Sequence, residues 1–137
     1  MIPKKIIVLL ENKDNENLID YVIPYIKQHS SEVYFICILE IPYKYSIDFE
    51  IGSQINLGEN ILKDAGHYLQ SQKINYDLNS DKFILLQSRN SGVGVIKESK
   101  RLDVDLILYT RSKKDNSYKY DYINKHSEVD TIQILKV

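Results

Sequence analysis

The sequence contains few of the residues that build disulfides, metal sites and phosphate-binding turns. Among its 137 residues are one cysteine, five glycines, three prolines and no tryptophan. A single cysteine excludes an internal disulfide and a zinc site built from several cysteines. This composition is typical of proteins of the reducing cytoplasm, where we expect this protein to be located.

Long apolar runs and an excess of one charge are also missing. The apolar runs are a handful of residues long, whereas a membrane-spanning helix needs about 20, and residues 1–5 lack the apolar core of a signal peptide. The formal net charge of −1 gives no global field that would attract nucleic acid or an anionic membrane. We therefore expect one soluble domain over residues 1–137, with no nucleic-acid partner and no membrane insertion.

Strand-like and helix-like patterns alternate along the chain. Short β-branched and aliphatic runs are typical of strands buried on both faces, and apolar residues three or four apart predict helices. The expected strands cover residues 6–10, 33–39, 83–86, 105–109 and 131–137, and the expected helices cover residues 15–29, 55–73, 91–102 and 117–125. This order predicts an α/β fold with a five-stranded, mostly parallel sheet and helices on both faces.

Several residues have a predicted role within these helices. Pro24 removes one hydrogen bond from the first helix and should bend it. Gly58 and Gly66 each cost the second helix about 1 kcal/mol. Ser91 is the expected N-cap of the third helix.

The ordered set of segments resembles the universal stress protein family over essentially the whole chain. Residues 6–12 are similar to that family's first strand and its exit, with Glu11 at the position of the family's aspartate. Residues 33–40, 89–91, 95–108 and 122–137 resemble the second strand, the turn before the third helix, the third helix with the fourth strand, and the closing helix and strand. The resemblance implies a flavodoxin-like domain with strand order 3-2-1-4-5 and a regulatory role in the stress response.

The loop after the fourth strand departs from the family at the positions that hold phosphate. Family members that bind ATP carry two glycines separated by two residues directly after this strand, and a Gly-Ser or Gly-Thr pair nine residues later. Here Thr110 and Lys113 occupy the two glycine positions, and Ser117 falls at the later pair after a shortened loop. Because a backbone cradle for phosphate favours positive φ and no Cβ, we predict a degenerate nucleotide-binding site and no cofactor.

A divergent site for ATP or another adenine nucleotide, with weak or no ATPase activity, is the alternative. Its side chains would be those of Glu11, Asn12, Ile38, Thr110, Lys113 and Ser117. The polar residues 11–14 equally suit an ordinary strand-to-helix loop with capping potential, which is the interpretation we favour.

The sequence offers no catalytic or metal-binding group. His29, His67 and His126 are far apart, and no serine, histidine and acid set stands out. Cys37 lies between Ile36 and Ile38 in an expected buried strand, where a small hydrophobic role is expected. We therefore predict a protein that is not an enzyme.

Two features point to protein partners. The segment from Thr131 to Val137 is a terminal strand whose open edge needs covering, and in the family this strand often pairs with its symmetry mate. We expect a homodimer formed in this way. The tyrosines at 118, 120 and 122 and the irregular segment from Tyr43 to Ser53 suit a protein interface, although the tyrosines could also stack on a base.

Overall fold

Strands and helices alternate along the chain in the order that the sequence predicted. The structure is a computed structural model that describes residues 2–12, 14–112 and 118–136. Its elements are β1 (Lys5–Leu9), α1 (Glu16–His29), β2 (Glu32–Glu40), α2 (Gly52–Ser71), β3 (Phe83–Ser88), α3 (Ser91–Leu102), β4 (Leu106–Ser112), α4 (Tyr118–His126) and β5 (Asp130–Lys136).

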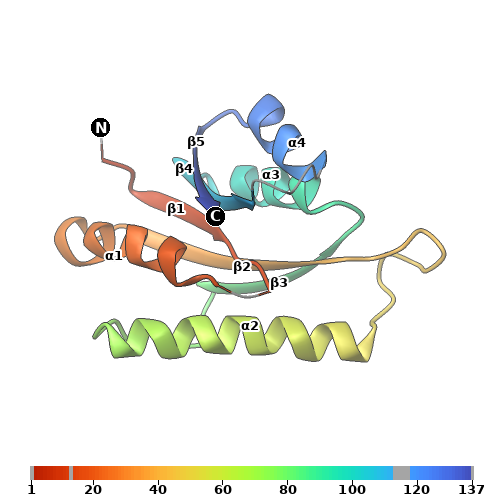
Figure 1. The fold of residues 1–137 in the computed structure, drawn as a ribbon, viewed down its shortest axis with the longest axis horizontal. Coiled ribbons are helices and arrows are strands. Elements are labelled where there is room, and N and C mark those ends of the chain that lie inside the picture. Colours follow the sequence, from red (N-terminus) through yellow and green to blue (C-terminus); the bar gives the residue numbers. More distant parts are fainter. Residues whose placement is uncertain (1, 13, 113–117, 137) are drawn as a thin grey trace.

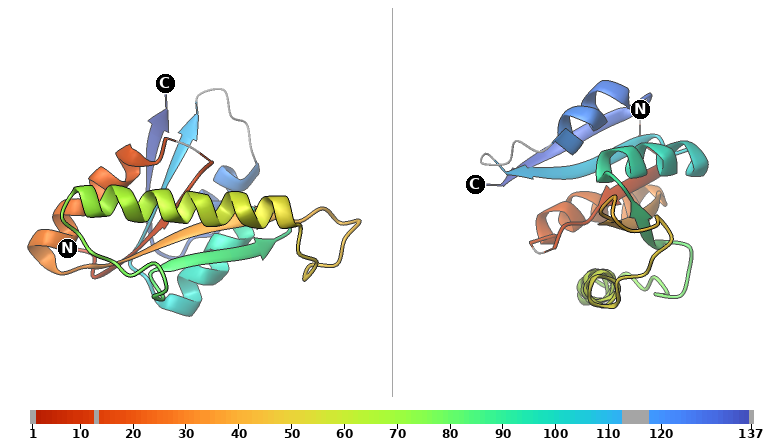
Figure 2. Two further views of the ribbon diagram at one scale, coloured as in Figure 1. Left: turned by 90° about the horizontal axis from the view of Figure 1, so that it is seen from below. Right: turned by 90° about the vertical axis from the view of Figure 1, so that its right-hand side faces the viewer.

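The five strands form one sheet in the order β3-β2-β1-β4-β5, which confirms the predicted order. Every neighbouring pair is parallel, with β1 between β2 and β4 at the centre. Helices α1 and α2 cover one face of the sheet, and α3 and α4 cover the other (Figures 1 and 2). The carboxyl ends of all five strands therefore lie at the same edge of the sheet.

The central strand β1 contributes side chains to a hydrophobic core on each face of the sheet. Successive side chains of a strand point to opposite faces, so Ile6 and Val8 join the core under α1 and α2. Ile7 and Leu9 join the core under α3. All four are at most 2% exposed, which is why this strand is a continuous apolar run rather than an alternating one.

Helix α2 approaches the sheet closely at Gly58. A Cβ atom at this position would lie 2.5 Å from Cδ1 of Leu85 and 3.2 Å from Cδ2 of Leu39. A side chain at this position would therefore require Leu85 to move. The glycine, which only lowers helix propensity when the sequence is considered alone, allows α2 to lie against β2 and β3.

Three local expectations need correction or refinement. The N-cap of α3 is Asn90 and not Ser91, because Oδ1 of Asn90 accepts hydrogen bonds from the backbone N–H groups of Gly92 (2.8 Å) and Val93 (3.2 Å). Helix α1 continues through Pro24. Strand β4 runs to Ser112, three residues beyond its expected end.

The close approach of α2 predicts a difference between two glycine substitutions. Gly58→Val should lower the free energy of unfolding by about 1–3 kcal/mol, because the new side chain overpacks the contact with Leu85. Gly52→Ala is the control, since nothing lies within 4 Å of a Cβ atom there. Urea denaturation of both variants is the measurement, and a Gly58→Val protein as stable as the parent would contradict the packing argument.

Candidate functional site

A cavity of about 320 Å³ lies at the carboxyl ends of β1 and β2. Ligands of open parallel α/β sheets bind at this edge. The lining residues that matter here are Glu11, Asn12, Cys37, Ile38, Glu40 and Ser91. The structure thus brings together three of the predicted site residues, namely Glu11, Asn12 and Ile38.

The loop between β1 and α1 is closed by its own hydrogen bonds. The backbone N–H of Glu11 donates to Oδ1 of Asn15 at 2.8 Å, and Nδ2 of Asn15 donates back to the carbonyl oxygen of Glu11 at 2.9 Å. The amide of Glu11 is therefore already paired and does not face the cavity as a free donor. This geometry supports the interpretation of the segment as a strand-to-helix loop.

A carboxylate of the protein occupies the N-terminus of α3. Oε2 of Glu40 accepts a hydrogen bond from the backbone N–H of Ser91 at 2.9 Å, and Asn90 caps the next two amides. The N-terminus of a helix attracts anions because of its free N–H groups and its dipole. Glu40 supplies that negative charge from within the chain, so an incoming phosphate would meet a carboxylate at this position.

Thr110 lies in a paired strand rather than in a loop. It is 2% exposed and stands opposite Ile134 of β5, and the pairing continues to Ser112 opposite Lys136. Among the described residues, Thr110 is not one of those that line the cavity. Lys113 and Ser117, the other two predicted site residues, lie outside the described residues.

Tyr109 connects β4 to α4 just before Thr110. Its ring is fully buried, and its hydroxyl donates to Oδ1 of Asn124 at 2.6 Å. A buried tyrosine needs such a partner for its hydroxyl group. The contact fixes the direction of the strand at the point where the nucleotide loop was expected to begin.

Cys37 is a buried thiol at the wall of the cavity. It is 4% exposed. Burial of the thiol, and secondarily the negative charge of Glu11, raise the pKa of Cys37 to about 11. The group is therefore a protonated thiol at neutral pH and a weak nucleophile, which agrees with the small hydrophobic role expected of it.

Sequence reasoning missed two residues of this edge, Glu40 and Asn90. The preference of asparagine for helix N-caps is a sequence signal that would have found Asn90. Glu40 and Ser91 are 51 residues apart in the chain, and no local pattern indicates that they meet.

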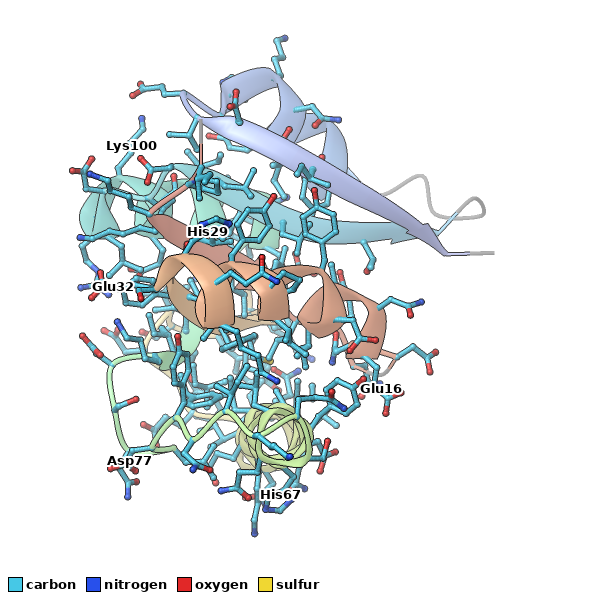
Figure 3. The ribbon with its side chains drawn as sticks, turned by 90° about the vertical axis from the view of Figure 1, so that its left-hand side faces the viewer. Glu16, His29, Glu32, His67, Asp77 and Lys100 are labelled. Atoms are coloured by element: carbon cyan, nitrogen blue, oxygen red, sulfur yellow. The ribbon has the colours of Figure 1, made fainter. Side chains whose placement is uncertain are left out.

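The described residues contain no group of three or more His, Cys, Asp or Glu side chains arranged to hold a metal ion. Figure 3 shows His29 at the end of α1 and His67 on the outer side of α2, on different helices. Within the described ranges, no helix is both long and apolar enough to cross a membrane.

Comparisons with known proteins agree on the fold. No protein-family model and no curated protein sequence matches the chain. Among solved structures, a universal stress protein from Archaeoglobus fulgidus superposes with a TM-score of 0.74 at 14% identity, covering 98% of this chain and 95% of its own. One from the same organism in complex with dAMP has a TM-score of 0.74 at 13% identity, with 98% and 99% covered.

A plant protein has a similar structure. A universal stress protein family member from Arabidopsis thaliana, with AMP bound, has a TM-score of 0.67 at 10% identity, covering 98% of this chain and 93% of its own. The chain therefore has the universal stress protein fold, as its sequence resemblance implied.

The raised pKa of Cys37 predicts how its alkylation depends on pH. Below the pKa the thiolate fraction grows tenfold per pH unit, so the rate with iodoacetamide should still rise by about tenfold per unit between pH 8 and pH 10. Glu11→Gln should increase the rate at pH 8, because removing the negative charge lowers the pKa. Intact-mass spectrometry measures both rates.

The matched control is Ser53→Cys in a Cys37→Ser background, which places the thiol at an exposed position of α2. Its rate should level off above about pH 8.5. A rate for Cys37 that levels off at the same pH as the exposed thiol would contradict the effect of burial.

Proposed function

We propose that this protein is a non-enzymatic, universal-stress-protein-like regulatory module of the stress response that does not bind ATP in the family manner. One observation carries the proposal, namely that β4 continues as a paired strand through Thr110 to Ser112. Successive amides of an extended strand point to opposite sides. Such a segment cannot gather several amides around one phosphate, as a glycine-rich turn does.

The charges at the strand ends support the same proposal. Glu11 and Glu40 place two carboxyl groups at the cavity, and Glu40 already occupies the N-terminus of α3. The negative charge of a phosphate is repelled by such carboxylates. A triphosphate in this cavity would meet two carboxylates and no amide cradle from β4.

A divergent adenine-nucleotide site is the second candidate. It is favoured by the cavity beside Glu11, Asn12 and Ile38 at the strand ends and by the dAMP and AMP complexes of proteins that share this fold. In this case side chains, including those of Thr110, Lys113 and Ser117, would replace the missing backbone cradle.

Nucleotide titration separates the two candidates. In calorimetry with ATP, ADP and AMP we expect no binding tighter than about 100 μM, which corresponds to about 5.5 kcal/mol. Denaturing the purified protein should release no nucleotide absorbance. Tighter binding that is lost in a folded Thr110→Ala, Lys113→Ala double variant would replace the proposal with the second candidate.

The proposed module is a cytoplasmic homodimer that pairs through its last strand. In the described part of the chain β5 is hydrogen-bonded to β4 alone, so its other side is an open sheet edge. A two-fold axis beside this edge would let two copies complete each other's hydrogen bonds.

The double variant Gln133→Glu, Ile134→Ala tests this dimer. A pair of copies joined through this strand would bring two new negative charges to its interface, and like charges opposite each other in a strand pair are destabilising. We expect sedimentation equilibrium to show a dimer for the parent protein and a monomer for the variant. A folded variant with the mass of the parent would show that the copies do not pair through this strand.

A further inference from the structure

Strand β3 forms the other edge of the sheet and lacks the usual protection of an edge strand (Figure 2). Natural sheets protect open edges with charged residues, proline, bulges or a covering element. The sequence of β3, FILLQS, has no charge and no proline, and all six residues are partly exposed. An apolar strand of this kind is a template for pairing with another chain.

The hydrogen bonds to β2 show which backbone groups of β3 face outward. Phe35 N–H donates to the carbonyl of Lys82 at 2.7 Å, and Ile41 N–H donates to that of Ser88 at 2.8 Å. Because parallel ladders use alternate residues, the N–H and C=O groups of Leu85 and Gln87 point away from β2. None of the described residues is hydrogen-bonded to these outward groups.

A groove of about 400 Å³ runs beside this edge on the side of α3. It is lined by Val93 and Lys97 of α3, by Leu86 of β3, and by Tyr43 and Ile47 of the loop between β2 and α2. Tyr43 is 84% exposed. The groove combines apolar surface with the open backbone edge, which is the arrangement that recognises extended peptides.

The loop that lines the groove is held in place by Gln87 of β3 and by Arg89, which follows the strand. Nε2 of Gln87 donates to the carbonyl oxygens of Ile47 (2.8 Å) and Phe49 (3.0 Å). Nη1 of Arg89 donates to the carbonyl oxygen of Pro42 at 2.7 Å. Because the loop is already held in one conformation, little conformational entropy is lost when a ligand binds beside it.

The charge of the groove selects the chemistry of its occupant. Arg89 and Lys97 line it, whereas the carboxylate of Glu98 is held by Arg101 through contacts of 2.7–3.1 Å. The remaining charge is positive and favours acidic side chains. A second copy of this chain would bring its own Arg89 and Lys97 to the same place, so like charges disfavour self-pairing.

We propose that the open edge of β3 binds an extended segment of a partner protein that carries both apolar and acidic side chains on the face turned toward the groove. The segment pairs with the outward groups of Leu85 and Gln87, and every second side chain enters the groove. There its apolar side chains contact Leu86 and Val93, and its carboxylates meet Arg89 and Lys97. The inference rests on the proposed function in that it identifies what a non-enzymatic module of this fold would recognise.

Selection of random dodecapeptides displayed on phage, with the full-length protein as bait, supplies the probe. We expect enriched peptides to carry an apolar residue and an Asp or Glu two residues apart, so that both lie on the face turned toward the groove. The best synthetic peptide is then added during amide hydrogen exchange followed by NMR. The amides of Leu85 and Gln87 should exchange at least about tenfold more slowly in the complex, because strand addition hydrogen-bonds them directly.

Variants test the edge and the charge separately. Leu85→Pro removes an outward N–H that the sheet does not use, and proline is tolerated on edge strands. Because it also removes a side chain that packs beside Gly58 of α2, circular dichroism first has to confirm the fold, and peptide binding by the folded variant should be lost. Lys97→Glu leaves the backbone intact and should weaken binding by about tenfold or more. Lys63→Glu makes the same charge change at an exposed position of α2 and should bind as the parent does.

Three peptide experiments can overturn the proposal: no peptide enriched on the parent protein, a bound peptide that leaves the exchange of Leu85 and Gln87 unchanged, or equal binding to the Lys97→Glu and Lys63→Glu proteins. If the amides of Leu85 and Gln87 exchange more slowly when the protein concentration is raised without peptide, a second copy of the chain occupies the edge. That result would also overturn the proposal. Nucleotide titration is independent of all these results, so a failed peptide selection and a failed function proposal remain distinguishable.

Discussion

The burial of β1 on both faces is the constraint on which the rest of this structure depends. Ile6 to Leu9 are enclosed by helices on either side of the sheet, so the neighbouring strands must cross over through helices and run parallel to β1. Parallel strands place all their carboxyl ends at one edge. The position of the cavity beside Glu11 and Ile38 follows from this arrangement before any binding residue is considered.

At this edge the chain satisfies its own backbone groups. Asn15 closes the loop after β1, Glu40 and Asn90 cap α3, and β5 pairs with the extension of β4. Each of these contacts occupies backbone N–H groups, or neutralises the positive end of a helix, that a phosphate would otherwise bind. The fold is thus shared with proteins solved in complex with dAMP and AMP, while the local geometry supports a function that does not depend on a nucleotide.

The two edges of the sheet differ in what surrounds them. β5 is the last strand of the chain, whereas β3 has a groove, an anchored loop and two cations beside its open backbone groups. Symmetric pairing is the proposed use of the β5 edge, whereas recognition of an acidic segment suits the basic surroundings of the β3 edge. A module of this fold would then carry a self-association edge and a partner edge on opposite sides of the same sheet.

The sequence by itself determined the element order, the strand order that the family resemblance implied, and the buried state of Cys37. The element order and the burial of Cys37 follow from local periodicity, to which each residue contributes through near neighbours in the chain, whereas the strand order came from the family resemblance. Only the tertiary structure decided that β4 extends to Ser112, because that extension depends on pairing with β5. It alone also brought Glu40 to the N-terminus of α3 and left Leu85 and Gln87 with outward-facing amides. These features depend on contacts between segments distant in the chain, and such contacts leave no periodic signal in either segment.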